Sequence, residues 1–71
     1  MMTTYLLSFF GGCWHLHCYD DEVSLIAAYI YNERDAIEMA MGLARQNRPS
    51  QVMRTLQSGE SSVLGVFESS Q

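Results

Sequence analysis

The amino-acid sequence predicts a small α+β domain, in which an antiparallel sheet of about five strands carries one α-helix on one face. One segment, residues 32–47, has the apolar spacing of an amphipathic helix. Other segments are short and apolar or alternating, and turn-forming residues separate them. The resulting order is β-β-β-α-β-β, and the short links within each group of strands imply antiparallel neighbours.

Length and composition favour one folded domain, residues 1–71, near the lower size limit for a useful core. Hydrophobic residues make up 48% of the chain and there is one proline, so disorder is not expected. A core of this size contributes only about 3–5 kcal/mol. Oligomerisation, a metal or a disulfide would therefore add useful stability.

The helix is predicted from Asn32 to Asn47. Asn32 can cap the first turn, and Asp35 stands where the carboxylate of a capping box lies. Pro49 stops the helix soon after its last residue. Its apolar stripe, whose small alanines would let it lie close to a sheet, consists of Ala36, Ile37, Ala40, Met41, Leu43 and Ala44.

Three strands are predicted before the helix, at 3–10, 13–19 and 23–31, and two after it, at 51–57 and 62–67. Gly11-Gly12 suits a two-residue hairpin turn between the first two strands. The acidic residues 20–22 mark the next turn, and residues 58–61 supply the last one. Gly65 marks either a bulge or a close approach of the backbone to another element.

The charge balance disfavours two classes of partner. Eight acidic residues face four arginines, the sequence has no lysine, and the net charge is −4. Attraction to phosphates needs clustered basic residues, so neither nucleic acid nor an anionic membrane surface is an expected partner. A basic partner protein fits the charge better.

The cellular location is expected to be the cytoplasm. The apolar run at residues 5–10 follows no basic segment and is too short to span a bilayer. Two cysteines do not make the framework of a secreted, disulfide-rich protein. No membrane partner is expected.

The second predicted strand holds the most reactive side chains of the chain, in CWHLHC at residues 13–18. Zinc takes about four ligands, and residues four apart in a strand lie about 13 Å apart, so one strand cannot hold the ion alone. No cofactor is expected. The purified protein should carry less than one zinc ion per chain. If the chain does bind a metal, a site shared across a dimer axis is the best form of that hypothesis. Alternation along the strand points Trp14, Leu16 and Cys18 to one face of the sheet. The other face receives Tyr19 and the three weak candidate ligands, Cys13, His15 and His17.

Catalysis is not expected from these side chains. Nucleophilic Cys–His chemistry needs thiolate and imidazole within about 3 Å of each other and an orienting group. Neighbours on one strand do not converge in that way, and Cys13 and Cys18 lack the CxxC spacing of a redox pair. The sequence predicts a protein that is not an enzyme, with no catalytic residues.

Three segments carry a resemblance that spans nearly the whole chain: GGCWHL at 11–16, DAIEMAMGLA at 35–44 and QVMRTLQSG at 51–59. They resemble a family of small, uncharacterised bacterial domains with a Gly-Gly turn before a Trp-bearing strand, an Ala-x-x-x-Ala helix and a closing hairpin. That family typically carries lysines and a more regular last hairpin, which this chain lacks. A helix followed by a VMR-type strand is also similar to small phage anti-CRISPR proteins, which implies a regulatory or inhibitory role.

One helix cannot cover both faces of five strands, yet these strands carry apolar and aromatic residues on both sides. The uncovered face is therefore expected to bind a partner. Arg54 either pairs with a carboxylate on the helix or at an edge, which is the favoured interpretation, or projects into the binding surface. The candidate contact residues are Tyr5, Phe9, His15, His17, Tyr19, Tyr29, Tyr31 and Arg54.

The function predicted from these features is that of a non-enzymatic protein-interaction module that binds a protein partner or itself. A homodimer, paired by sheet face or by edge, would hide the surplus apolar surface, and the strands have no lysine or proline to protect their edges. The alternative is an accessory protein that binds metal through the Cys/His strand, or single-stranded nucleic acid through bases stacked on the aromatic sheet.

Overall fold

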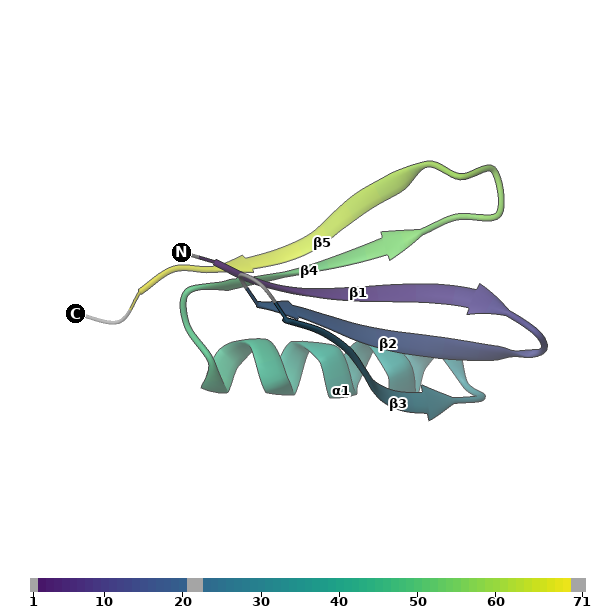
Figure 1. The fold of residues 1–71 in the computed structure, drawn as a ribbon, viewed down its shortest axis with the longest axis horizontal. Helices are drawn as coiled ribbons and strands as arrows, with labels where there is room; N and C mark the ends of the chain where they lie inside the picture. The colour runs from purple at the N-terminus through teal and green to yellow at the C-terminus, as the bar shows by residue number, and fades with distance from the viewer. Residues whose placement is uncertain (1, 21–22, 70–71) are drawn as a thin grey trace.

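The computed structural model describes residues 2–20 and 23–69 and contains the elements in the predicted order (Figure 1). The third strand ends one residue earlier than predicted, which leaves Tyr31 outside the sheet. The acidic turn keeps only Asp20 within the described residues, because 21 and 22 lie outside them. The elements are β1 (Thr3–Phe10), β2 (Cys13–Asp20), β3 (Val23–Ile30), α1 (Glu33–Gln46), β4 (Ser50–Thr55) and β5 (Ser61–Phe67).

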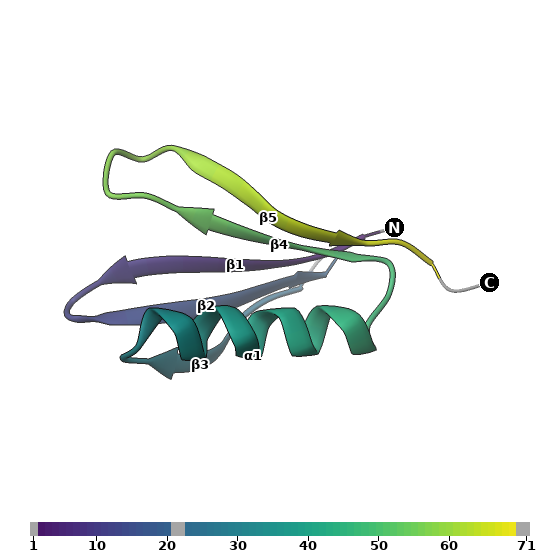
Figure 2. The same ribbon diagram turned by 180° about the vertical axis from the view of Figure 1, so that it is seen from behind.

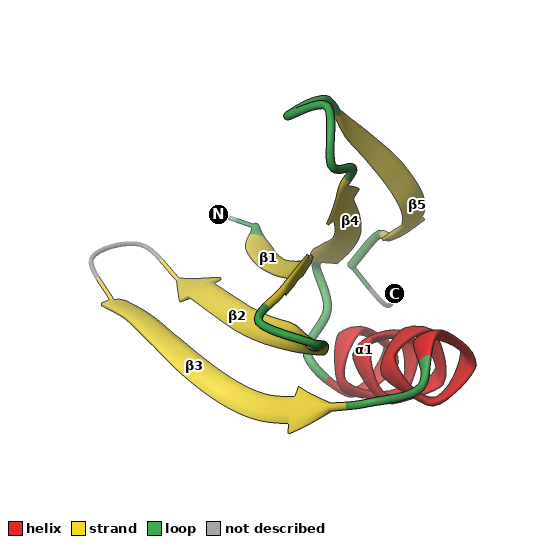
Figure 3. Ribbon diagram, turned by 90° about the vertical axis from the view of Figure 1, so that its right-hand side faces the viewer, coloured by secondary structure: helices red, strands yellow, loops and turns green. Residues whose placement is uncertain are grey.

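The strands form one sheet in the order β3-β2-β1-β4-β5, with α1 on one face (Figures 2 and 3). This confirms the predicted class of a small α+β domain with five strands and one helix. The sheet is mixed, however, rather than antiparallel throughout: β1 pairs antiparallel with β2 but parallel with β4. The reason is that α1 carries the chain back along the sheet after β3, so β4 starts at the same end as β1.

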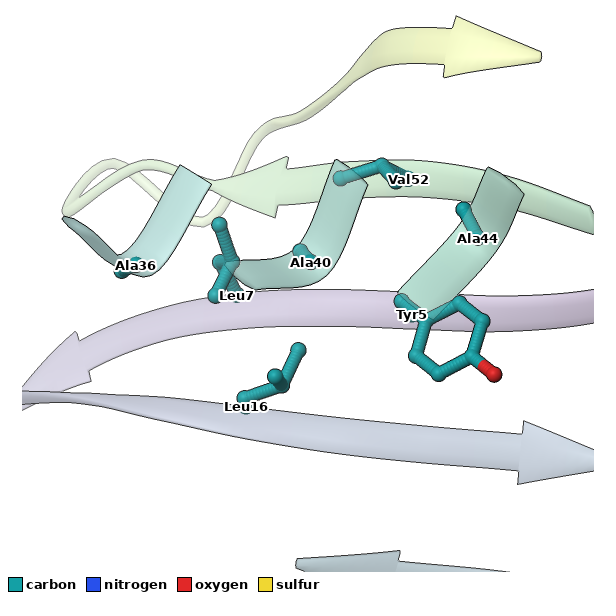
Figure 4. Packing of buried hydrophobic residues seen from close by; sticks show 7 residues of the cluster. All are labelled: Tyr5, Leu7, Leu16, Ala36, Ala40, Ala44 and Val52. Carbon is teal, nitrogen blue, oxygen red and sulfur yellow. The ribbon is translucent and has the colours of Figure 1, made fainter. Parts of the chain in front are cut away.

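The stripe of alanines on α1 packs directly on the sheet. Ala36, Ala40 and Ala44 are fully buried, and the core beneath them comes from the three central strands (Figure 4). The predicted cap is present, since Asn32 accepts a hydrogen bond from the Asp35 backbone. The buried sheet residues of this core are Tyr5, Leu7, Leu16 and Val52.

Polar contacts fix both ends of the helix to β4. Near its start, Arg54 donates to the Glu33 carboxylate over 2.9 Å. Near its end, the buried hydroxyl of Ser50 donates to the Ala44 carbonyl over 2.6 Å. Both contacts join α1 to β4, and the ion pair is partly exposed to solvent.

Each edge strand carries one extra residue that interrupts the ladder. In β3 the extra residue is Ala27, which has no partner in β2. In β5 it is Leu64, which has no partner in β4. Such bulges twist an edge away from regular pairing, so the edges are protected although they lack lysine and proline. Gly65 also approaches α1 closely, because a β-carbon there would lie 3.2 Å from the Met41 methyl carbon.

Replacing Ala40 with aspartate should unfold the domain. The change places an unpaired charge between helix and sheet and should lower the free energy of unfolding by about 3 kcal/mol or more. Urea unfolding followed by circular dichroism measures the loss. Met39→Asp, which puts the same charge on the exposed side of the same turn, is the control. Equal destabilisation by the two variants would contradict the observed helix orientation.

Candidate functional site

The candidate site is the sheet face opposite α1, which we call the open face. The registers of the five strands determine which side chains share it. None of these described residues carries a charged side chain, although the chain as a whole has a net charge of −4. The open face consists of Thr4, Leu6, Ser8, Phe10, Cys13, His15, His17, Tyr19, Ser24, Ile26, Tyr29, Gln51, Met53, Thr55, Ser61, Val63 and Val66.

Aromatic rings follow β2 along the middle of the β3–β2–β1 half of this face. The rings of Phe10 and His15 stack, with centroids 3.7 Å apart and planes 2° apart. Tyr29 meets His15 edge-on at 4.9 Å. The series continues at 6.4 Å from His15 to His17 and at 6.0 Å from His17 to Tyr19. Its spacing follows the two-residue repeat of a strand, which places successive rings about 6.6 Å apart.

His15 is the most enclosed member of this series, with 9% of its surface exposed. Its Nε2 lies 3.1 Å from the Phe10 carbonyl oxygen, and because that oxygen can only accept, Nε2 carries the proton. The Sγ atom of Cys13 lies 3.7 Å from the same nitrogen. Nδ1 is buried and has no hydrogen-bond partner. The imidazole therefore uses one nitrogen and leaves the other unsatisfied.

The predicted alternation of β2 is confirmed, since the register puts Cys13, His15, His17 and Tyr19 on the open face. Tyr29 also lies there and is 60% exposed. Four of the eight predicted contact residues therefore share the open face, on β2 and β3: His15, His17, Tyr19 and Tyr29.

Two predicted contact residues lie on the wrong side of the sheet. A two-residue turn pairs Phe10 with Cys13, and therefore Phe9 with Trp14, so Phe9 faces the same side as α1. Tyr5 shares that side and is only 4% exposed. Counting the pairs outward from Gly11-Gly12 gives this register from the sequence, and it also places Phe10 on the open face.

Tyr31 and Arg54 are also absent from the open face. Tyr31 follows β3, is 83% exposed and belongs to neither side of the sheet. Arg54 points to the side of α1 and pairs with Glu33, as the favoured interpretation predicted. The sequence reasoning missed the aliphatic members Ile26, Val63 and Val66, because their positions depend on the two bulges.

The geometry offers little for catalysis or for a metal in a single chain. Within residues 2–20 and 23–69 there is no pocket, and no group of three or more His, Cys, Asp or Glu side chains that could hold an ion. In the same part of the chain, no helix has the length and apolar character needed to cross a membrane. The described residues of the open face are aromatic, aliphatic or polar and uncharged, which suits contact with another surface.

No protein-family model, curated protein or solved structure matches this chain. The resemblance to small bacterial domains and to phage anti-CRISPR proteins stays a prediction. Any assignment of function therefore depends on the geometry of the open face.

Tyr5 should make stability depend on alkaline pH. Burial raises the pKa of Tyr5 above its ordinary value of 10.0, the neighbouring Cys18 adds to the shift, and a hydrogen bond from Asn47 opposes it. A raised pKa in the folded state means that this stability is present below about pH 10 and is lost as the pH rises through the folded-state pKa. Urea unfolding at about pH 9 and about pH 11 should show the loss.

Tyr5→Phe should reduce this pH dependence, whereas Tyr31→Phe, at the exposed position, should leave it as in the parent. If both variants retained the full dependence, another group would be responsible for the alkaline loss.

Proposed function

We propose that this protein is a small, non-enzymatic interaction module whose binding surface is the open face. The observation that carries the proposal is that a whole sheet face exposes apolar and aromatic side chains and no described charge. Contiguous surfaces of this kind usually mark sites of protein contact. Its exposed apolar members are Phe10, Tyr19, Ile26, Tyr29, Val63 and Val66.

A second copy of the chain is the partner that this surface fits best. The basic partner that the net charge suggested would meet no carboxylate here, because the described acidic residues lie on α1, in turns or at strand and chain ends. An uncharged face can approach its own copy without like-charge repulsion. Pairing two such faces would also add the buried apolar area that a domain of this size lacks.

Face-to-face contact is favoured over pairing of edges. Both edge strands contain a bulge, at Ala27 and at Leu64, which disrupts the straight ladder that a further strand would extend. The described residues of the open face include no charge that would oppose contact with a second copy in the same way. The open face does not favour stacking of nucleic-acid bases, because its described residues include no cation that could contact phosphates.

Tyr29→Asp should weaken self-association at least about tenfold, because it brings two unpaired carboxylates into an apolar contact. Sedimentation equilibrium over a micromolar concentration series measures the dissociation constant. Tyr31→Asp is the matched control, since it introduces the same charge at an exposed tyrosine outside the sheet. If the parent protein stayed monomeric at every concentration, the homodimer would be refuted. If both variants weakened self-association equally, the open face would not be the dimer interface.

Acidification should weaken the same contact. Protonating His15 and His17 would place positive charges in a face whose other titratable groups are Cys13, Tyr19 and Tyr29, with no described carboxylate to offset them. The dissociation constant should therefore rise on acidification. His17→Gln should reduce this dependence while the fold persists. A dissociation constant independent of pH between about 7.5 and 5.5 would exclude the histidines from the contact.

A further inference from the structure

We infer that two copies of the chain pair about a twofold axis along β1, so that the aromatic half of each open face covers the aliphatic half of the other. The inference rests on the homodimer proposed above and specifies how its two copies are arranged. It starts from the strand order β3-β2-β1-β4-β5, in which β1 is the middle strand. This strand divides the open face into two unlike halves.

The two halves differ in bulk. On the β3–β2 side, the rings of His15, His17 and Tyr19 follow one another along β2, with centroids 6.4 and 6.0 Å apart, and we call them the ring row. Tyr29 adds a further ring from β3. One half of the face therefore stands higher than the other. The β4–β5 half has no ring among its described residues, which are Gln51, Met53, Thr55, Ser61, Val63 and Val66.

Overlap and bulk together select the axis. Sheets that pack face to face lie about 10 Å apart and interdigitate their side chains, so bulky groups must meet low ones. An axis along β1 lays all five strands of one copy over all five of the other, whereas an axis along any other strand leaves at least two strands of each copy uncovered. An axis across the strands also covers all five, but it lays β2 on β2 and sets ring row against ring row. The axis along β1 is the arrangement that avoids both faults.

The strand registers then determine which side chains meet. Rotation about β1 keeps the level of each residue along the strands, lays β2 of one copy over β4 of the other, and lays β3 over β5. Leu6 lies on the axis and meets its own equivalent. His17 and Met53 both pair with Leu6 within the sheet, so they share one level and face each other across the interface. Ile26 and Val63 lie at the same level on the two edge strands and meet likewise.

Polar groups at the margins of the contact also match. Tyr29 of one copy lies at the level of Ser61 of the other, and Tyr19 lies at the level of Gln51. The two tyrosine hydroxyls therefore meet a hydroxyl and an amide instead of apolar side chains. Polar groups in an interface need such partners, because a buried group without a hydrogen bond is costly.

An exchange of charges between copies tests this arrangement. Ile26 and Val63 are 47% and 53% exposed, so charged variants should fold. Within one chain the two residues are four strand spacings apart, about 19 Å, and cannot pair with each other. Ile26→Asp and Val63→Lys should each weaken self-association at least about tenfold, because each buries an unpaired charge. An equimolar mixture of the two variants should recover to within about threefold of the parent, since the new carboxylate of one copy meets the new ammonium group of the other.

Sedimentation equilibrium measures the association, and native mass spectrometry identifies the mixed dimer by its mass. The control is a mixture of Ile26→Asp with Ile26→Lys, whose charges would meet if the ring rows lay on each other and brought β3 over β3. This mixture should show no recovery. Recovery in the control, or none in the first mixture, overturns the axis along β1 and leaves the homodimer standing. A parent chain that stays monomeric at every concentration overturns the homodimer itself.

Discussion

The structure depends on the close packing of one small-residue helix against one face of the sheet. Ala36, Ala40 and Ala44 have no side-chain atoms beyond the β-carbon, so α1 can lie directly on Leu7 and Leu16. This contact supplies nearly all of the fully buried apolar surface of the described chain. Because the described residues form one helix and five strands, the same contact that forms the core also determines which face remains open.

The distribution of charge follows from this one-sided arrangement. Polar and charged groups fix the helix in place, through Arg54 to Glu33 at one end and Ser50 to Ala44 at the other. The open face carries only rings, aliphatic side chains and small polar groups. A surface selected only for solubility would carry charges, particularly in a domain with so little core, since charged residues normally dominate exposed positions. Their absence here is the physical reason to regard the open face as an interface.

Local chemistry made the elements predictable, whereas long-range pairing did not. The helix follows from its cap and its alanine spacing, and the β1–β2 hairpin from Gly11-Gly12. The two-residue turn also determines the register of β1 on β2, and this register excludes Tyr5 and Phe9 from the open face. The sequence prediction did not count residue pairs outward from the turn and therefore placed both residues on the wrong side. No turn connects β1 with β4, so nothing local indicated that they pair in parallel. The bulge at Ala27, which decides the facing of Ile26, has no such local signal, and Gly65 indicated the bulge at Leu64, beside Val63 and Val66, only as an alternative to a close approach.

The central claim is that the open face is buried against another protein surface, and side-chain NMR as a function of concentration tests it most directly. On dilution from millimolar to low micromolar protein, the resonances of Tyr29, Val63 and Val66 should shift together along one binding curve. Those of Ala36 beneath α1 and of Tyr31 outside the sheet should stay fixed. Concentration-dependent shifts on the outer side of α1, with the open-face resonances unchanged, would contradict the account.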